Sequence, residues 1–112
     1  TLVVGAYKED SNQTTITNDN STASSNNSNA DSGAVYVYKR TGTTWAQEAY
    51  IKASNNGEGD SFGSTIALVD NETLAVGASG EDSDQSTITN GISTSSNNNS
   101  SNSGAVYVYS FK

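Results

Sequence analysis

Residues 60–79, DSFGSTIALVDNETLAVGAS, determine the fold that this sequence predicts. Two apolar runs, Ser64–Val69 and Thr73–Ala78, flank the short polar segment Asp70–Glu72. Short apolar runs of this kind, bounded by Asn, Asp and Gly, are typical of β-strands joined by tight turns. The stretch therefore predicts a hairpin of two antiparallel strands.

The second half of this hairpin occurs twice in the chain, which indicates an internal repeat. Residues 1–18 align with residues 73–90, and residues 32–38 align with residues 103–109. The offset is 72 in the first alignment and 71 in the second, because one residue is lost in the Ser- and Asn-rich stretch between them. A fixed period that changes length only in its polar part is typical of structural repeats.

Each full repeat unit contains four predicted strands, and the sequence predicts no helix. Strands are expected in the full unit at Trp45–Ala53, Ser64–Val69, Thr73–Ala78 and Gly104–Tyr109, and in a preceding partial unit at Thr1–Ala6 and Gly33–Tyr38. Four short antiparallel strands per repeat are typical of a propeller blade or a comparable stacked sheet. The predicted fold class is therefore all-β, with about one and a half four-stranded, antiparallel, blade-like repeats of the β-propeller type.

The repeat also predicts how the chain is divided. Residues 1–40 are expected to form the C-terminal half of a preceding blade, with two strands around a Ser- and Asn-rich insertion. Residues 41–112 are expected to form one complete four-strand repeat with a similar insertion at residues 80–103. Within this repeat, the alternating pattern after Trp45 indicates a half-exposed outer strand.

Four residues of the opening stretch are expected to matter for packing. Phe62 and Leu74 are predicted core residues, and Gly63 and Gly77 are expected to permit close approach of the sheets.

The two insertions contain too little apolar sequence to offset the entropy of ordering them. Their centres, residues 21–29 and 93–102, are therefore expected to be flexible. Their ends keep one pattern in both copies and are expected to be ordered, with Ile16 and Ile88 as small apolar anchors.

Several motifs in a fixed order connect the chain to a known family. They are Trp45, GDSFG at residues 59–63, IAL at 66–68, LAVGAS at 74–79 and GAVYVY at 104–109. This set resembles the FG-GAP repeat, the blade unit of integrin-α-like β-propellers, in its bacterial and extracellular form. The resemblance implies a propeller blade in a protein that works outside the cell.

The sequence departs from the family pattern at two places. Ser79 and Tyr7 stand where the family's GAP motif has Pro. The family's calcium loop is also missing, since only Asp70–Glu72 joins the two central strands. Calcium takes six to eight oxygen ligands, and a three-residue turn cannot surround the ion. The family's calcium site is therefore not expected here.

Composition excludes several classes of partner. The 112 residues carry a formal net charge of −7, whereas nucleic-acid binding needs a basic footprint. No apolar run approaches the roughly 18 residues of a membrane span, so we expect no membrane insertion. Acidity of this kind keeps a secreted protein soluble. We expect an extracellular or cell-surface location, and we interpret the chain as part of a longer or processed polypeptide.

The sequence favours a protein without catalytic activity. It contains no His and no Cys, which excludes the usual nucleophile–base pairs and His or Cys metal ligands. Glu58 and Asp60 are the nearest approach to a catalytic carboxylate pair. Two carboxylates in one loop are more often solvated side chains, and we predict no enzyme and no certain cofactor.

The start of the second insertion offers one candidate metal site. Glu81, Asp82 and Asp84 alternate oxygen side chains in a way that suits calcium, a hard cation. The plainer interpretation is an acidic loop start stabilised by Asx turns. Both interpretations stay open at this point, with calcium as the single cofactor considered.

Six sequons make the chain a candidate glycoprotein. They begin at Asn12, Asn20, Asn26, Asn71, Asn98 and Asn99. In so Asn- and Ser-rich a sequence many arise by chance, which is the alternative. The tyrosines at 36, 38, 107 and 109, with Trp45, offer a carbohydrate-stacking platform, but alternating strand positions favour a place in the core.

These features lead to three hypotheses for the function. The first is a non-enzymatic extracellular repeat protein acting in adhesion or as a structural matrix element. The second is a subunit of an extracellular, glycosylated filament built by stacking the repeats. The third is a non-catalytic module of a larger secreted enzyme. Since repeat units need neighbours to bury their faces, the expected partners are further copies of the repeat, together with glycans or surface proteins.

Overall fold

A computed structural model provides the structure, which describes residues 1–18, 26–91 and 94–111. These residues form six strands: β1 (Leu2–Ala6), β2 (Ala34–Thr41), β3 (Thr44–Ile51), β4 (Phe62–Val69), β5 (Thr73–Ala78) and β6 (Ala105–Ser110). The described residues contain no helix of the length and apolar content needed to cross a membrane. The prediction of an all-β chain is confirmed.

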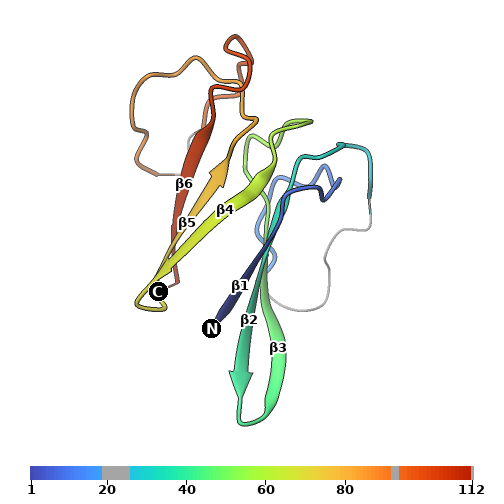
Figure 1. The fold of residues 1–112 in the computed structure, drawn as a ribbon, viewed down its shortest axis with the longest axis vertical. Helices are drawn as coiled ribbons and strands as arrows, with labels where there is room; N and C mark the ends of the chain where they lie inside the picture. Colours follow the sequence, from blue (N-terminus) through green and yellow to red (C-terminus); the bar gives the residue numbers. More distant parts are fainter. Residues whose placement is uncertain (19–25, 92–93, 112) are drawn as a thin grey trace.

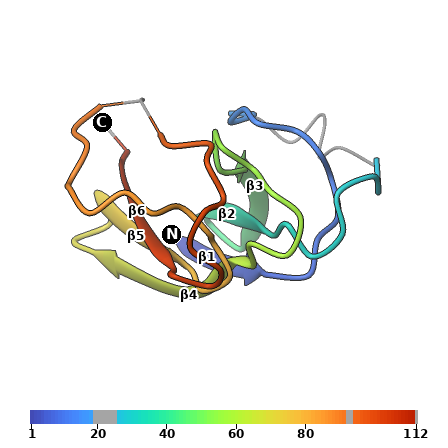
Figure 2. The same ribbon diagram turned by 90° about the horizontal axis from the view of Figure 1, so that it is seen from above.

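The six strands form two antiparallel sheets of three strands each (Figure 1). The first sheet has the order β1-β2-β3 and the second the order β4-β5-β6. The sheets meet where β1 contacts β4, and Figure 2 shows them side by side. Both insertions begin and end at the upper end of the sheets in Figure 1.

The four-stranded sheet expected within residues 41–112 is not formed by the described residues. The strand that contains Trp45 is β3, and it pairs with β2 in the first sheet. Gly42, with φ +62°, allows a tight turn between β2 and β3, so the two strands become antiparallel neighbours. Residues 52–61 then carry the chain to the second sheet. The division at residues 40 and 41 follows the sequence period and, like the propeller, stays a prediction.

Glycine allows the two sheets to come into direct backbone contact. A Cβ on Gly5 of β1 would collide with the carbonyl oxygen of Gly63 in β4. A Cβ on Gly63 would lie 2.6 Å from the Ala34 carbonyl oxygen, and Gly63 has φ +92°. The predicted role of Gly63 is therefore confirmed. The predicted role of Gly77 is wrong, since a Cβ there would meet the Thr65 side chain of β4, which is its neighbour within the same sheet.

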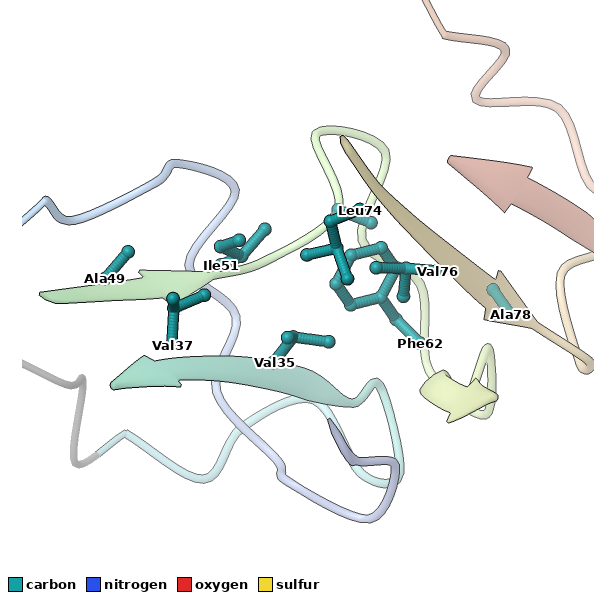
Figure 3. Close-up of a cluster of buried hydrophobic side chains, with 9 residues drawn as sticks. Val35, Val37, Ala49, Ile51, Phe62, Leu74, Val76 and Ala78 are labelled. Atoms are coloured by element: carbon teal, nitrogen blue, oxygen red, sulfur yellow. The ribbon is translucent and has the colours of Figure 1, made fainter. Parts of the chain in front are cut away.

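The core lies between the sheets (Figure 3). Buried side chains of the first sheet meet those of the second: Val35, Val37, Ala49 and Ile51 on one side, Phe62, Leu74, Val76 and Ala78 on the other. The Phe62 ring packs edge-on against Tyr107 and Tyr109, with centroids 5.2 and 6.3 Å away. Burial of each large apolar side chain contributes about 1.5–3 kcal/mol. The predicted core residues Phe62 and Leu74 are confirmed.

Candidate functional site

The ends of both insertions fold into the same backbone motif. In the first insertion, Asn29 N–H donates to the Asp10 carbonyl and Gly33 N–H to the Glu9 carbonyl, each at 2.8 Å. In the second, Ser100 and Gly104 donate in the same way to Asp82 and Glu81, at 2.7 and 2.8 Å. The chain thus leaves and re-enters each sheet through two segments that are hydrogen-bonded to each other. The prediction of ordered ends is confirmed, and the hydrogen bonds of Asn29 and Ser100 extend this pairing into the stretches expected to be flexible; residues 19–25 and 92–93 lie outside the described residues.

Polar side chains repeat this duplication. The Glu9 carboxylate accepts a hydrogen bond from Ser11 N–H, and Gln13 Nε2 donates to the Thr15 carbonyl and to Thr17 Oγ1. The same bonds join Glu81, Ser83, Gln85, Thr87 and Thr89 in the second insertion.

The predicted apolar anchors are wrong, because Ile16 and Ile88 are both exposed and Ile88 is 89% exposed. The first insertion is fixed instead by backbone hydrogen bonds between Thr17 and Tyr50, 2.9 and 2.8 Å long.

A buried lysine, Lys52, joins the two ends of the first insertion beside the first sheet. Lys52 follows β3, its side chain is fully buried, and its Nζ donates to Glu9 Oε2 and Ser32 Oγ, both at 2.8 Å. Burial lowers the pKa of Lys52, while the hydrogen bond and charge of Glu9 act in the opposite direction. Sequence reasoning missed this residue, although a lone cation next to an apolar strand and a repeated Glu offered a signal.

Asp60 is a buried carboxyl that the sequence suggested would be solvated. Its Oδ2 accepts the Gly57 N–H at 2.8 Å, which closes its own loop. Burial raises the pKa of Asp60 to about 6, the Gly57 hydrogen bond lowers it, and the charges of Glu81 and Asp82 raise it further. Glu58 is exposed, so the two carboxylates do not share one environment.

The three candidate calcium ligands each have a separate partner in the second insertion. Glu81 Oε2 accepts from Ser83 N–H at 3.1 Å and Asp82 Oδ1 from Asn102 N–H at 2.5 Å. Asp84 Oδ2 accepts from Asn99 Nδ2 at 3.3 Å. In the described ranges, no three acidic, His or Cys side chains are grouped to hold a metal. Calcium at Glu81, Asp82 and Asp84 stays a prediction.

The candidate glycosylation residues lie on the surface wherever the structure describes them. Asn12, Asn26, Asn71, Asn98 and Asn99 are exposed, and Asn20 lies outside the described residues. Asn71 lies in the turn between β4 and β5, and Asn26 accepts a hydrogen bond from Asn12 N–H at 3.4 Å. Glycosylation stays a prediction.

The aromatic side chains are divided between the two sheets. Tyr107 and Tyr109 pack on Phe62, and Tyr36 packs on Tyr50 at 5.1 Å between ring centroids. The predicted place in the core is confirmed for Tyr107 and Tyr109, whereas Tyr36 packs on Tyr50 outside the core cluster and Tyr38 is half-buried. Trp45 is half exposed.

The outer face of the first sheet repeats the buried face of the second. Leu74 and Val76 of β5 are fully buried against the first sheet. Their equivalents at the 72-residue offset, Leu2 and Val4 of β1, are 47% and 41% exposed.

The outer face of the second sheet in turn repeats the buried face of the first. Val35 and Val37 of β2 are fully buried, whereas their equivalents Val106 and Val108 of β6 are 71% and 68% exposed. Each outer face therefore presents the side chains that the molecule already uses at its own sheet-to-sheet contact.

A family model described as FG-GAP repeat matches residues 45–109, which is more than half of the chain. The protein therefore belongs to the FG-GAP repeat family, as its motifs predicted. The matched segment begins in β3 and ends in β6, so it includes strands of both sheets. Neither the curated proteins nor the solved structures gave a match.

Proposed function

We propose that this protein is a non-enzymatic extracellular or cell-surface repeat module that acts in adhesion or as a structural matrix element. It works by stacking with further copies of its own repeat. The proposal rests on one observation. The exposed outer face of each sheet carries the residues that are equivalent, in the repeat, to the buried core residues of the other sheet. A copy that places its Leu2 and Val4 face on the Val106 and Val108 face reproduces a contact that this sequence already stabilises.

Such a contact is heterologous, because two different faces meet. Heterologous contacts generate a closed ring when the rotation closes and an open filament when it does not. The ring corresponds to a propeller-borne adhesin and the filament to the extracellular fibre. The reciprocal faces favour both assemblies over the third hypothesis, a non-catalytic module of a larger secreted enzyme.

Family membership and composition support the extracellular part of the proposal. FG-GAP repeats are typical of extracellular proteins, and the chain is acidic and free of Cys. The exposed sequon asparagines and polar insertions suit glycan attachment, so glycans and surface proteins are proposed as further partners. No part of the stacking mechanism requires chemistry, and the sequence contains neither His nor Cys.

Sedimentation velocity across a concentration series tests the stacking. The chain is expected to associate, and Val108→Asp is expected to prevent this because a charge on the outer face would be buried unpaired. Thr43→Asp, in the exposed turn between β2 and β3, is the matched control. A chain that stays monomeric, or a Val108→Asp variant that associates normally, would contradict the proposal.

Electron microscopy of the native material separates the two assemblies, since discrete toroids indicate a propeller and continuous fibres a filament. Antibody labelling of intact cells tests the location. Labelling that requires permeabilised cells would contradict the surface assignment. Intact mass compared with the sequence mass tests glycosylation.

A further inference from the structure

We infer that the outer edge of β6 is a slot for a β-strand supplied by a further copy of this repeat, and that Glu81 and Ser103 bind a lysine on that strand. The inference rests on the proposed stacking function and specifies what the incoming copy must carry.

In the first sheet, β3 occupies the position that we propose for the incoming strand at the second sheet. One edge of β3 pairs with β2 over seven residue pairs, from Val35 with Ile51 to Thr41 with Thr44. On its other side, Tyr50 of β3 exchanges two backbone hydrogen bonds with Thr17 of the first insertion. The strand is therefore held between a sheet edge and an insertion.

The second sheet also has a strand edge with an insertion beside it, but among the described residues no strand lies between the two. The strand equivalent to β2 is β6, which forms the end of the order β4-β5-β6. The residue equivalent to Thr17 is Thr89, and Gln85 fixes it as Gln13 fixes Thr17. In Figure 1 the second insertion arches beside β6.

A hollow of about 960 Å³ lies between these walls. It is lined along the whole of β6 from Ala105 to Ser110 and by residues 87–90 of the second insertion, and it extends to residues 14–16, 52, 54 and 55 on the side of the first sheet. An unpaired strand edge offers backbone N–H and C=O groups to an incoming strand. Strand addition of this kind is a common way for proteins to bind extended segments, with the main chain giving affinity and side-chain pockets giving specificity.

The second sheet has equivalents of the Glu and Ser residues that bind Lys52 at the first sheet, but in the ranges that the structure describes no lysine is bound to them. In the first sheet, one oxygen of Glu9 accepts the Ser11 N–H and the other accepts Lys52 Nζ. In the second, Glu81 Oε2 accepts the equivalent Ser83 N–H, and Glu81 Oε1 receives a long 3.3 Å hydrogen bond from Asn55.

The serine of the site is duplicated as well. Ser103 Oγ donates to the Glu81 and Ser83 carbonyls at 3.2 and 2.7 Å. Ser32 Oγ donates to Glu9 and Ser11 in the same way and also accepts from Lys52 Nζ.

Charge then identifies the occupant. Glu81 is only 4% exposed, and within the described part of the chain it forms no ion pair. A buried carboxylate without a cation is costly, so a strand that brings an ammonium group is favoured over one that does not. At the 71-residue offset, an incoming β3 from a unit that begins at Gly42, and so has no β2 of its own on that edge, sets its Tyr50 opposite Tyr107 and its Ile51 opposite Val106. Its Lys52 then lies next to Glu81, as Lys52 lies next to Glu9.

Isothermal titration of the whole chain with a synthetic peptide tests the inference. The peptide has the sequence of residues 42–54, GTTWAQEAYIKAS, with blocked ends. Binding is expected, with slowed hydrogen exchange of the β6 amides. A peptide with Lys52→Met is expected to bind at least about 30-fold more weakly, because one partner of a buried charge pair is lost.

A variant chain with Glu81→Gln supplies the second arm. It is expected to bind the natural peptide at least about 10-fold more weakly and to discriminate little between the two peptides. Glu58→Gln, at an exposed loop position, removes the same charge and should leave binding unchanged. Unchanged β5 and β6 amide signals in the Glu81→Gln chain show that its fold is intact.

Two results would overturn the inference: no binding at β6, or binding that ignores both the lysine and Glu81. If the chain still associates in sedimentation, only the slot is wrong and the stacking proposal stands. If the peptide binds as expected but the chain never associates, the slot stands and the stacking proposal fails.

Discussion

Breaking the Lys52–Glu9 pair should destabilise the fold far more than any exposed charge does. Lys52→Met keeps the buried stem but leaves the Glu9 carboxylate, 14% exposed, without its cation. Glu9→Gln leaves a fully buried ammonium with Ser32 as its hydrogen-bond acceptor. Removing one member of a buried pair costs about 3–5 kcal/mol, and the partial exposure of Glu9 favours the lower value.

Urea unfolding of the two single variants and the double variant measures this cost. Each single variant should lose about 3 kcal/mol, which corresponds to a fall in melting temperature of roughly 10–20 °C for a chain of this size. The double variant should lose at least about 1.5 kcal/mol less than the sum, because neither unpaired charge remains buried. Lys39→Met with Glu48→Gln, both exposed, is the control pair. Additive single effects, or losses as small as those of the control, would refute the reasoning.

Three further changes test the core, the sheet contact and the buried carboxyl. Phe62→Ala should cost about 3–5 kcal/mol in urea unfolding, since the ring is fully buried; a loss below about 1 kcal/mol contradicts the core assignment. Gly63→Ala should destabilise more than Gly42→Ala, because both have positive φ but only Gly63 faces nearby backbone; equal melting temperatures count against the close approach. Asp60 in the folded chain has a pKa of about 6, so it keeps its proton at a pH where the unfolded chain, with an ordinary pKa, has lost it. Stability therefore falls as the pH is raised from about 4 to about 6. This loss of unfolding free energy is at most roughly 3 kcal/mol; Asp60→Asn should remove the accompanying fall in melting temperature, while the exposed control Asp70→Asn keeps it, and the same pH profile in both variants would exclude Asp60 as the cause.

The local structure could be predicted because it depends on patterns within a few residues. The hairpin around Asp70–Glu72 and the apolar runs of β1, β2, β5 and β6 follow from alternation and from turn residues. The core positions of Phe62 and Leu74 follow from the same patterns.

The membership of β3 could not be predicted from the repeat. A sequence period states which strands recur, but it does not state which sheet each strand joins. That choice depends on the turn at Gly42, which places β3 next to β2, and on the linker that leads away from it.

The lysine site could not be predicted from local sequence patterns either. Lys52 and Glu9 are 43 residues apart, and the alternating pattern after Trp45 predicted only a half-exposed outer strand, with no partner for the lysine. The two oxygens of Glu9 become a lysine site only after β1 and β3 are placed on either side of β2. The duplicated Glu, Ser and Gln positions were visible in the sequence, but their hydrogen bonds were not.

Extending the chain by one repeat tests the stacking proposal most directly. Residues 42–112 placed directly after Lys112 continue the register, since Tyr109 to Lys112 then lead into Gly42 as Tyr38 to Thr41 do. In stacked repeats, each added interface contributes to the stability of its neighbours. The extended protein should therefore unfold in one cooperative transition at a higher temperature than the single chain. An unchanged melting temperature, or two independent transitions, would contradict the proposal that each sheet is completed by the next copy.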